Sequence, residues 1–153
     1  MPSRLLKEFL NENNIKYISI SHSMAFTAVD VAKSAHVHSR DMAKTVIIKV
    51  DGKMAMAVVP ANYKVDLDIL RHVLNTPQIE LAQESEFISH FKDCEVGAMP
   101  PFGCLYDMDV YISERLSEDE HITFNAGSHL EVIQLNYRDY EKLVKPKFIF
   151  LNN

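Results

Sequence analysis

Apolar residues near the start of the chain recur at helical spacing. A helix is predicted over residues 3–13 because its apolar side chains share one face: Leu5, Leu6, Phe9 and Leu10. Capping side chains or similar spacing predict further helices over residues 27–35, from Asp66 to Leu74, over residues 84–91, and over residues 137–144. In helix 84–91 the expected apolar side consists of Phe87, Ile88 and Phe91.

The clearest strand pattern lies in the middle of the chain. Residues 43–50 and 53–59 are apolar runs joined by Asp51-Gly52, a dipeptide typical of tight hairpins, and Pro60 stops the second run. Both runs are apolar on both faces, which is typical of central strands in a sheet whose two faces are covered. Shorter strands are predicted at residues 17–20, 109–113, 122–126 and 130–135.

Helices and strands are mixed without a strict β-α-β alternation. This pattern favours an α+β fold, with a mixed, curved and barrel-like sheet of about six or seven strands and helices packed outside it. The length of 153 residues suits one domain with a substantial core, and no repeat or flexible linker divides it. We therefore expect residues 1–153 to form a single domain.

Charge and apolar runs narrow the class of protein. A formal net charge of −5 counts against broad, non-specific binding of nucleic acid, which depends on many phosphate contacts. It leaves open a protein that grips only the end of an RNA with a few well-placed cations. No apolar run approaches the ~20 residues that span a bilayer, and the first residues lack the apolar stretch of a signal peptide. We expect a cytoplasmic protein that does not bind membranes.

The motifs of several common chemistries are missing. The sequence has no Gly-x-Gly-x-x-Gly, Walker, Gly-x-Ser-x-Gly or Cys-x-x-Cys motif. His36 with His38, and His90 with Cys94, have the spacing of half a metal site, but no completing pair stands out, and catalytic zinc needs three protein ligands. We expect no metal, no cofactor, and no disulfide between Cys94 and Cys104 in a reducing compartment.

Lys44 is the first candidate for chemistry. It opens an apolar strand and shares a face with Val46, Ile48 and Val50, because strand side chains alternate between faces. A cation there is costly unless its ammonium reaches water or an anion. Contact with solvent at the strand end is the plainer interpretation, and binding of an anion is the alternative.

Two loops are the other candidates. Residues 97–103 contain two prolines between two glycines, so this loop is stiff but can present backbone N–H groups to a ligand oxygen. Residues 125–129 form a small-residue loop between two strands, which could also admit a ligand. A simple turn and a hairpin connection are the plainer interpretations, and the residues alone leave both open.

In this order, the three segments resemble the YbaK family, which includes the editing domain inserted in bacterial prolyl-tRNA synthetases. The resemblance covers about residues 3–146. It rests on His22 with Phe26-Thr27-Ala28, the strand 42–49, the loop 97–103, and Phe124-Asn125-Ala126-Gly127-Ser128. It implies the fold of that family and an enzyme that hydrolyses amino acids wrongly attached to tRNA.

The resemblance also implies roles for individual residues. Lys44 matches the essential lysine of the family and is expected to contact the phosphate or ribose of the terminal adenosine. Gly97 and Pro101 match a Gly-x-x-x-Pro motif whose glycine backbone positions the ester carbonyl. Lys44 and Gly97 are thus the expected catalytic residues. The expected substrate-binding residues are His22, Phe26, Thr27, Thr45, Met99, Pro101, Phe102, Gly127 and Ser128.

The sequence shows no convincing pair of nucleophile and general base. The resemblance implies instead that the free hydroxyl of the terminal ribose helps to activate water. Pocket size would then set specificity, with Met24, Phe26, Met99 and Phe102 as candidate wall residues and core packing as the alternative. A stiff loop with bulky neighbours favours a small amino acid, first alanine on proline tRNA and then serine, threonine or cysteine.

The implied partner is the acceptor end of an aminoacyl-tRNA, and an aminoacyl-tRNA synthetase is a candidate second partner. Two other functions stay open. One is a non-catalytic module of the same fold that holds tRNA ends or a synthetase. The other is a metal-dependent hydrolase of a different kind.

Overall fold

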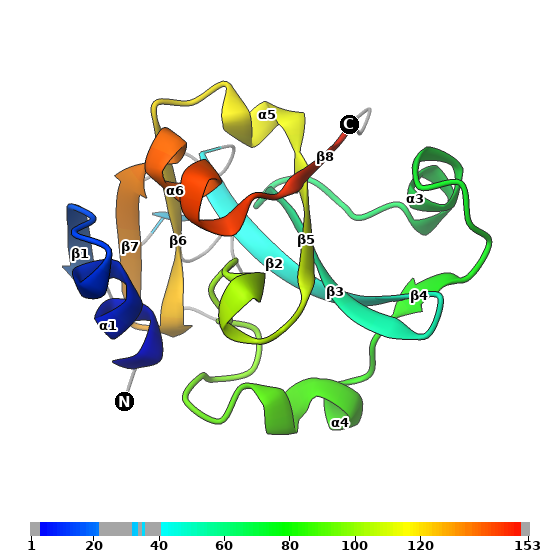
Figure 1. The fold of residues 1–153 in the computed structure, drawn as a ribbon, viewed down its shortest axis with the longest axis horizontal. Helices are drawn as coiled ribbons and strands as arrows, with labels where there is room; N and C mark the ends of the chain where they lie inside the picture. Colours follow the sequence, from blue (N-terminus) through cyan, green and yellow to red (C-terminus); the bar gives the residue numbers. More distant parts are fainter. Residues whose placement is uncertain (1–3, 22–31, 34, 36–40, 151–153) are drawn as a thin grey trace.

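The computed structural model describes residues 4–21, 32–33, 35 and 41–150, which form an α+β fold around one curled, mixed sheet (Figure 1). The strands are β1 (Tyr17–Ser21), β2 (Met42–Val50), β3 (Lys53–Pro60), β4 (Ile79–Leu81), β5 (Asp109–Ser113), β6 (His121–Ser128), β7 (Glu131–Asn136) and β8 (Lys147–Ile149). The helices are α1 (Arg4–Glu12), α3 (Leu67–Val73), α4 (Glu84–Phe87), α5 (Glu114–Ser117) and α6 (Tyr137–Val144), with short 3₁₀ turns at Ile88–His90 and Gly103–Leu105.

The sheet runs in the order β1-β7-β6-β2-β3-β5-β8, and β4 also pairs with β2. The pairs β2·β6, β3·β5 and β5·β8 are parallel, whereas the other pairs are antiparallel. The predicted mixed, curved sheet is therefore confirmed. None of the helices in the described part of the chain is long and apolar enough to cross a membrane.

The central hairpin follows from its turn chemistry. Asp51 and Gly52 both have positive φ, at 53° and 81°. This is the backbone geometry of a two-residue turn whose twist matches that of the strands. The strands β2 and β3 pair from Val50↔Lys53 at the turn to Ala43↔Pro60 at the far end. The hairpin predicted from the sequence is thus confirmed, with its turn at the expected dipeptide.

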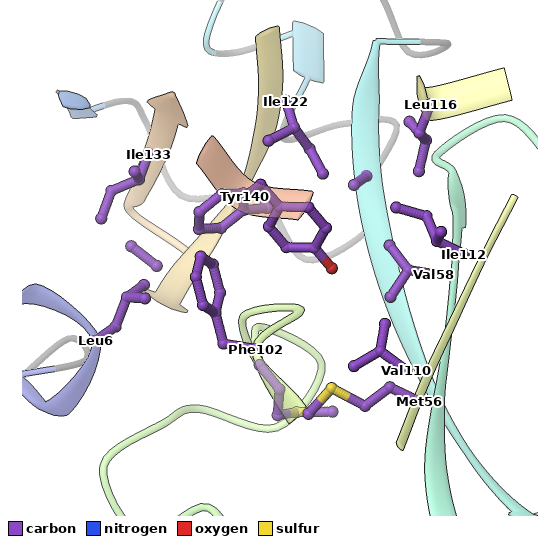
Figure 2. Close-up of a cluster of buried hydrophobic side chains, with 14 of the residues drawn as sticks. Leu6, Met56, Val58, Phe102, Val110, Ile112, Leu116, Ile122, Ile133 and Tyr140 are labelled. Atoms are coloured by element: carbon purple, nitrogen blue, oxygen red, sulfur yellow. The ribbon is translucent and has the colours of Figure 1, made fainter. Parts of the chain in front are cut away.

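Alternate residues of this hairpin face two different hydrophobic clusters. Ile47 and Val58 belong to the main cluster, in which Phe102 and Tyr140 are the largest fully buried side chains (Figure 2). Ile48, Ala57 and Val59, on the opposite face, belong to a second cluster that packs against α3 and β4. Both faces of the central strands are covered, as their two-sided apolar pattern predicts.

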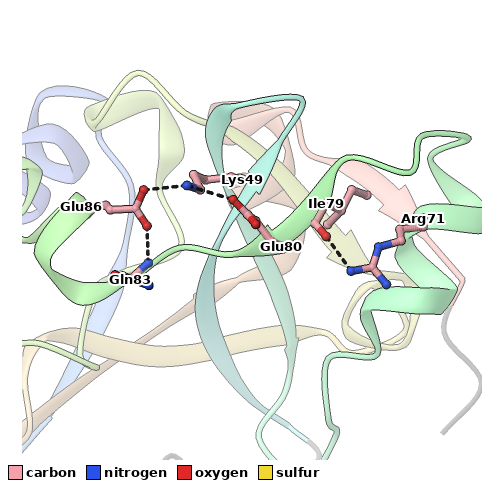
Figure 3. A network of polar contacts seen from close by, with 6 residues as sticks. All are labelled: Lys49, Arg71, Ile79, Glu80, Gln83 and Glu86. Carbon is pink, nitrogen blue, oxygen red and sulfur yellow. Dashed lines mark hydrogen bonds and ion pairs between the residues drawn. The ribbon is translucent and has the colours of Figure 1, made fainter.

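The outer edge of β2 is shared by two strands. β6 pairs with the start of β2, where Ala43 lies opposite Phe124, and β4 pairs with its end. Lys49 links this end of β2 to β4 and α4 by two ion pairs. Its ammonium lies 3.0 Å from Glu80 Oε1 in β4 and 2.7 Å from Glu86 Oε2 in α4 (Figure 3). The start of β2, which carries Lys44, therefore lies beside β6.

Helix boundaries agree with the predicted caps at several ends. The side chain of Asp66 accepts hydrogen bonds from the N–H groups of Asp68 and Ile69, and that of Asn136 accepts one from Arg138. The predicted helix 84–91 is wrong in its second half. Here α4 ends at Phe87 and continues as a 3₁₀ turn, so Ile88 rotates outward and is 48% exposed while Phe87 and Phe91 are buried. The predicted helix 27–35 lies mostly outside the described residues.

Candidate active site

The two candidate loops are joined by backbone hydrogen bonds. The N–H of Gly127 donates to Ala98 O at 2.9 Å, and the N–H of Glu95 donates to Gly127 O at 2.8 Å. Gly127 has a φ of 87°, a conformation that favours glycine, and this bend turns the end of β6 toward the other loop. The loops predicted separately from the sequence thus form one structural unit.

His129 makes further hydrogen bonds that hold the two loops together. Its ring Nε2 lies 2.8 Å from the carbonyl oxygen of Val96, and its backbone N–H donates to Glu95 Oε1 at 3.2 Å. Because a carbonyl oxygen can only accept, Nε2 must carry the proton in this contact. The ring is only 5% exposed. The sequence places His129 in the loop but gives no sign of this role, since its partners are backbone atoms far along the chain.

The Val96–Gly97 peptide is thereby held at both ends. Its carbonyl accepts from His129, and its N–H, on Gly97, points at the thioether sulfur of Met99 at 3.3 Å. Gly97 has a φ of 85°. A thioether is a weak acceptor, so this N–H makes a much weaker hydrogen bond than one to an oxygen.

Lys44 lies close to this unit along the sheet. Ala43 pairs with Phe124 in the parallel β2·β6 contact, and Lys44 and Asn125 follow them on the opposite face. Gly127 lies two residues beyond Asn125, a distance of roughly 7 Å along the strand at ~3.3 Å per residue. Lys44 and the joined loops therefore lie near one another along the β2·β6 contact.

The surroundings of Lys44 suit an anion. Burial, and then the charge of nearby Lys64, lower the pKa of the Lys44 ammonium from its ordinary value of 10.5. Among the residues that the structure describes, no carboxylate forms an ion pair with Lys44. The adjacent Asn125 is 6% exposed, and its Oδ1 has no hydrogen-bond partner within the described part of the chain. A half-buried cation can bind an anionic group, and the amide oxygen of Asn125 can accept a hydrogen bond from a ligand hydroxyl.

A cavity of about 940 Å³ opens beside the joined loops. Gly127, Ser128 and Glu95 line it, together with Ser21 and Glu131 from β1 and β7. The Ser128 hydroxyl accepts the N–H of Leu130 at 3.0 Å, which holds the Ser128 side chain at the cavity wall. The expected substrate-binding residues Gly127 and Ser128 therefore line this cavity although both are largely buried, whereas Lys44 and Gly97 are not among its lining residues.

Other predicted site residues are placed differently. Phe102 is fully buried in the main cluster, where its ring packs 5.3 Å from those of Phe124 and Tyr140, and Met99 is 6% exposed. These positions favour core packing over a role in the pocket wall. The carbonyl of Pro101 accepts a hydrogen bond from Tyr140. A direct contact of Phe102 with substrate would require the core to open.

Thr45 and Lys44 point to opposite faces of β2, because they are adjacent in a strand. Thr45 shares its face with Ala43 and Ile47, which belong to the main cluster. Its side chain is therefore directed away from that of Lys44. The predicted residues His22, Phe26 and Thr27, as well as Met24, lie outside the described residues.

Thiol and metal chemistry have little support in the described part of the chain. Cys94 and Cys104 are free thiols, and burial raises the pKa of the Cys94 thiol to about 12. A thiol with such a pKa is a poor nucleophile at neutral pH. Within the described residues, no group of three or more His, Cys, Asp or Glu side chains could hold a metal ion.

Solved structures with this fold match nearly the whole chain. A proposed trans-editing enzyme for prolyl-tRNA synthetase has a TM-score of 0.80 at 15% identity, with 98% of this chain and 96% of that chain covered. A hypothetical protein has a TM-score of 0.82 at 13% identity, with 95% and 97% covered. A scaffold protein from computational epitope grafting has a TM-score of 0.80 at 14% identity, with 98% and 96% covered. These likenesses establish the fold.

Comparison with curated proteins finds no match to the sequence. A family model described as the aminoacyl-tRNA editing domain matches residues 22–143, a range that includes Lys44, both candidate loops and His129. This match confirms the resemblance to the YbaK family, and the chain belongs to the aminoacyl-tRNA editing domain family.

Proposed function

We propose that this protein is an aminoacyl-tRNA deacylase, which hydrolyses the ester between a small amino acid and the terminal ribose of a tRNA. The observation that carries the proposal is the junction of the Gly97 and Gly127 loops beside the β2·β6 strand pair that carries Lys44. Membership of the editing-domain family supports the same activity.

Lys44 would bind the phosphate or ribose oxygens of the terminal adenosine. Burial, and then repulsion from the Lys64 ammonium, lower the pKa of the Lys44 ammonium. A phosphate between or beside the two cations would relieve that repulsion. A site that grips only an RNA end needs a few well-placed cations, so the net charge of −5 does not count against this partner.

The backbone N–H of Gly97 would polarise the ester carbonyl and stabilise the oxyanion that forms when water attacks. One well-placed donor of this kind can lower a barrier by about 3 kcal/mol. The free hydroxyl of the terminal ribose would help to activate the water, a role that the resemblance to the YbaK family implies. The protein would contribute mainly orientation, which can itself remove several kcal/mol from a barrier.

The first substrate that we propose is alanine on proline tRNA, followed by serine, threonine and cysteine. One support is the fold shared with a structure described as a proposed trans-editing enzyme for prolyl-tRNA synthetase. The other is the stiffness of the loop 97–103, because Met99 and Phe102 anchor it in the core and its two prolines restrict its backbone. A rigid loop can exclude a proline ring by steric clash. An aminoacyl-tRNA synthetase remains a candidate second partner that could enforce tRNA identity.

The test is a time course of ester hydrolysis with alanyl-, seryl-, cysteinyl- and prolyl-charged tRNA at a fixed enzyme concentration. We expect fast cleavage of the alanyl ester, slow cleavage of the prolyl ester, and no cleavage by the Lys44→Ala variant. Equal rates on the alanyl and prolyl esters would rule out exclusion by size. Binding of tRNA without cleavage of any ester would favour the non-catalytic binding module instead.

A further inference from the structure

We propose that His129 is a positioning residue that sets the orientation and strength of the Gly97 N–H donor by holding the other end of the same peptide group. The inference rests on the proposed function, in which this N–H polarises the ester carbonyl. It deepens that function by assigning a role to a side chain outside the predicted substrate-binding set.

The first support is the peptide geometry. Val96 O and the Gly97 N–H belong to one planar unit, so fixing the carbonyl fixes the direction of the N–H. His129 Nε2 lies 2.8 Å from Val96 O, which is a short and therefore well-formed contact. Gly97, whose φ is 85°, has no side chain whose packing could orient this peptide.

The second support is that His129 is itself held in place. Its backbone N–H donates to the Glu95 carboxylate at 3.2 Å, and the neighbouring Gly127 carbonyl accepts the N–H of Glu95 at 2.8 Å. A Cβ added at Gly97 would lie 3.5 Å from His129 Cε1, so the ring lies directly against this glycine. The imidazole thus reaches Val96 from a loop with little freedom to move.

The third support is electronic. A peptide whose carbonyl accepts a strong hydrogen bond becomes a better donor at its N–H, because hydrogen bonds in a chain polarise one another. Among the described residues, the Gly97 N–H meets only the thioether of Met99, at 3.3 Å. An ester carbonyl oxygen is a better acceptor than this sulfur, so the Gly97 N–H can form a stronger hydrogen bond with an ester than with Met99.

The experiment compares His129→Leu, which removes the donor, with His129→Gln, whose amide can place an N–H near the position of Nε2. The matched control is His121→Leu, at an exposed position at the start of β6. Circular dichroism and thermal unfolding of each variant establish that it is folded. Kinetics on alanyl-charged tRNA should show kcat reduced at least tenfold in His129→Leu, with KM within twofold of wild type. We expect His129→Gln to recover most of the loss and His121→Leu to be unaffected.

A second readout does not depend on activity. The chain has four glycines, so labelling with ¹⁵N-glycine gives a backbone spectrum of only Gly52, Gly97, Gly103 and Gly127. The Gly97 amide signal should shift upfield in His129→Leu and return toward its wild-type position in His129→Gln, while the Gly52 signal stays fixed. An unchanged Gly97 signal, or a kcat of His129→Leu within twofold of wild type, overturns the proposal.

The two readouts also separate this inference from the function on which it rests. Inactivity of the wild-type protein on every ester would overturn the proposed function and, with it, the catalytic use of Gly97. The Gly97 signal would still show whether His129 holds the Val96–Gly97 peptide. An active wild type with an unchanged Gly97 signal would contradict the role of His129 alone.

Discussion

The hydroxyl of Tyr140 donates a buried hydrogen bond to the carbonyl oxygen of Pro101 at 2.7 Å. This contact connects α6 to the loop 97–103, and the Tyr140 ring packs edge to face against Phe102 in the same loop. The loop that carries Gly97 is therefore anchored from inside the core. Its stiffness depends on a helix near the C-terminal end of the chain as well as on its prolines.

Replacing Tyr140 by Phe should lower the free energy of unfolding by about 1–3 kcal/mol, because it leaves a buried carbonyl without a partner while it keeps the ring. Urea denaturation with wild type as reference measures this loss. The matched control is Tyr137→Phe, since the Tyr137 hydroxyl is half-buried and its contact with Glu141 is long, at 3.5 Å. Equal effects of the two substitutions would mean that the Pro101 contact has no special weight.

Lys44→Met should abolish deacylation without destabilising the protein at neutral pH. Burial and Lys64 lower the pKa of Lys44 in the folded state below the unfolded value, so the charged ammonium is less favourable in the folded protein. This penalty is fully present below the folded pKa and disappears as the pH rises through it toward 10.5. Lys44→Met removes the penalty, and we expect it to be at least as stable as wild type at pH 7.

Thermal unfolding between pH 7 and pH 10 tests whether the charged Lys44 destabilises the folded protein. The stability of wild type should approach that of Lys44→Met as the pH rises, so the difference between their melting temperatures should shrink. Lys53→Met is a suitable control, because Lys53 is exposed at the far end of the hairpin. A Lys44→Met variant that is much less stable than wild type at pH 7 would show that Lys44 has a favourable partner in the folded protein.

Local signals explain why much of the fold can be predicted from the sequence. The turn dipeptide Asp51-Gly52 and the caps Asp66 and Asn136 act on residues next to them, so their consequences are readable without knowing the fold. The strands β4 and β8 were missed for the opposite reason. Each is short, and each exists because a longer strand, β2 or β5, offers it a free edge.

The candidate site likewise combines residues with local sequence signals and residues whose place depends on tertiary neighbours. Lys44 and the two glycine loops could be singled out as candidates because their residue types are unusual for their positions in a strand or a turn. Asn125 and His129 could not be assigned a role, because it arises from tertiary neighbours. Asn125 lies beside Lys44 through the β2·β6 contact, and His129 bonds to Val96 across a long stretch of sequence. Phe102 was a candidate for the pocket wall, but a bulky aromatic residue gives no sequence sign of which side it faces.

Cys94 should react slowly with iodoacetamide in the folded protein. With its thiol pKa at about 12, only about one molecule in 10⁴ carries a thiolate at pH 8, whereas an ordinary cysteine is substantially ionised there. Mass spectrometry of native protein and of protein in urea gives the two alkylation rates. We also expect Cys94→Ala and Cys104→Ala to retain near-wild-type deacylation. Loss of activity in either variant comparable to that of Lys44→Ala would indicate a thiol nucleophile and contradict the proposed mechanism.

Two glycines with nearly the same backbone allow strain and function to be separated. Gly97 and Gly52 have φ values of 85° and 81°, and an added Cβ would meet only the His129 ring at Gly97, at 3.5 Å and beyond, and nothing within 4 Å at Gly52. Neither alanine substitution creates a steric clash, so each should cost about 1–2 kcal/mol of stability through the unfavourable positive φ alone. The two variants should therefore have similar melting temperatures, both below that of wild type.

Their activities should differ sharply. Gly97→Ala strains the peptide that is proposed to hold the ester carbonyl and adds a methyl group beside its N–H, so we expect kcat on alanyl-charged tRNA to fall at least tenfold. Gly52→Ala acts at the turn of the hairpin, away from the end of β2 that carries Lys44, and should leave kcat within twofold of wild type. Because stability is matched, a drop confined to Gly97→Ala must come from the site and not from a smaller folded population. Equal kcat values in the two variants would remove the Gly97 backbone from the mechanism.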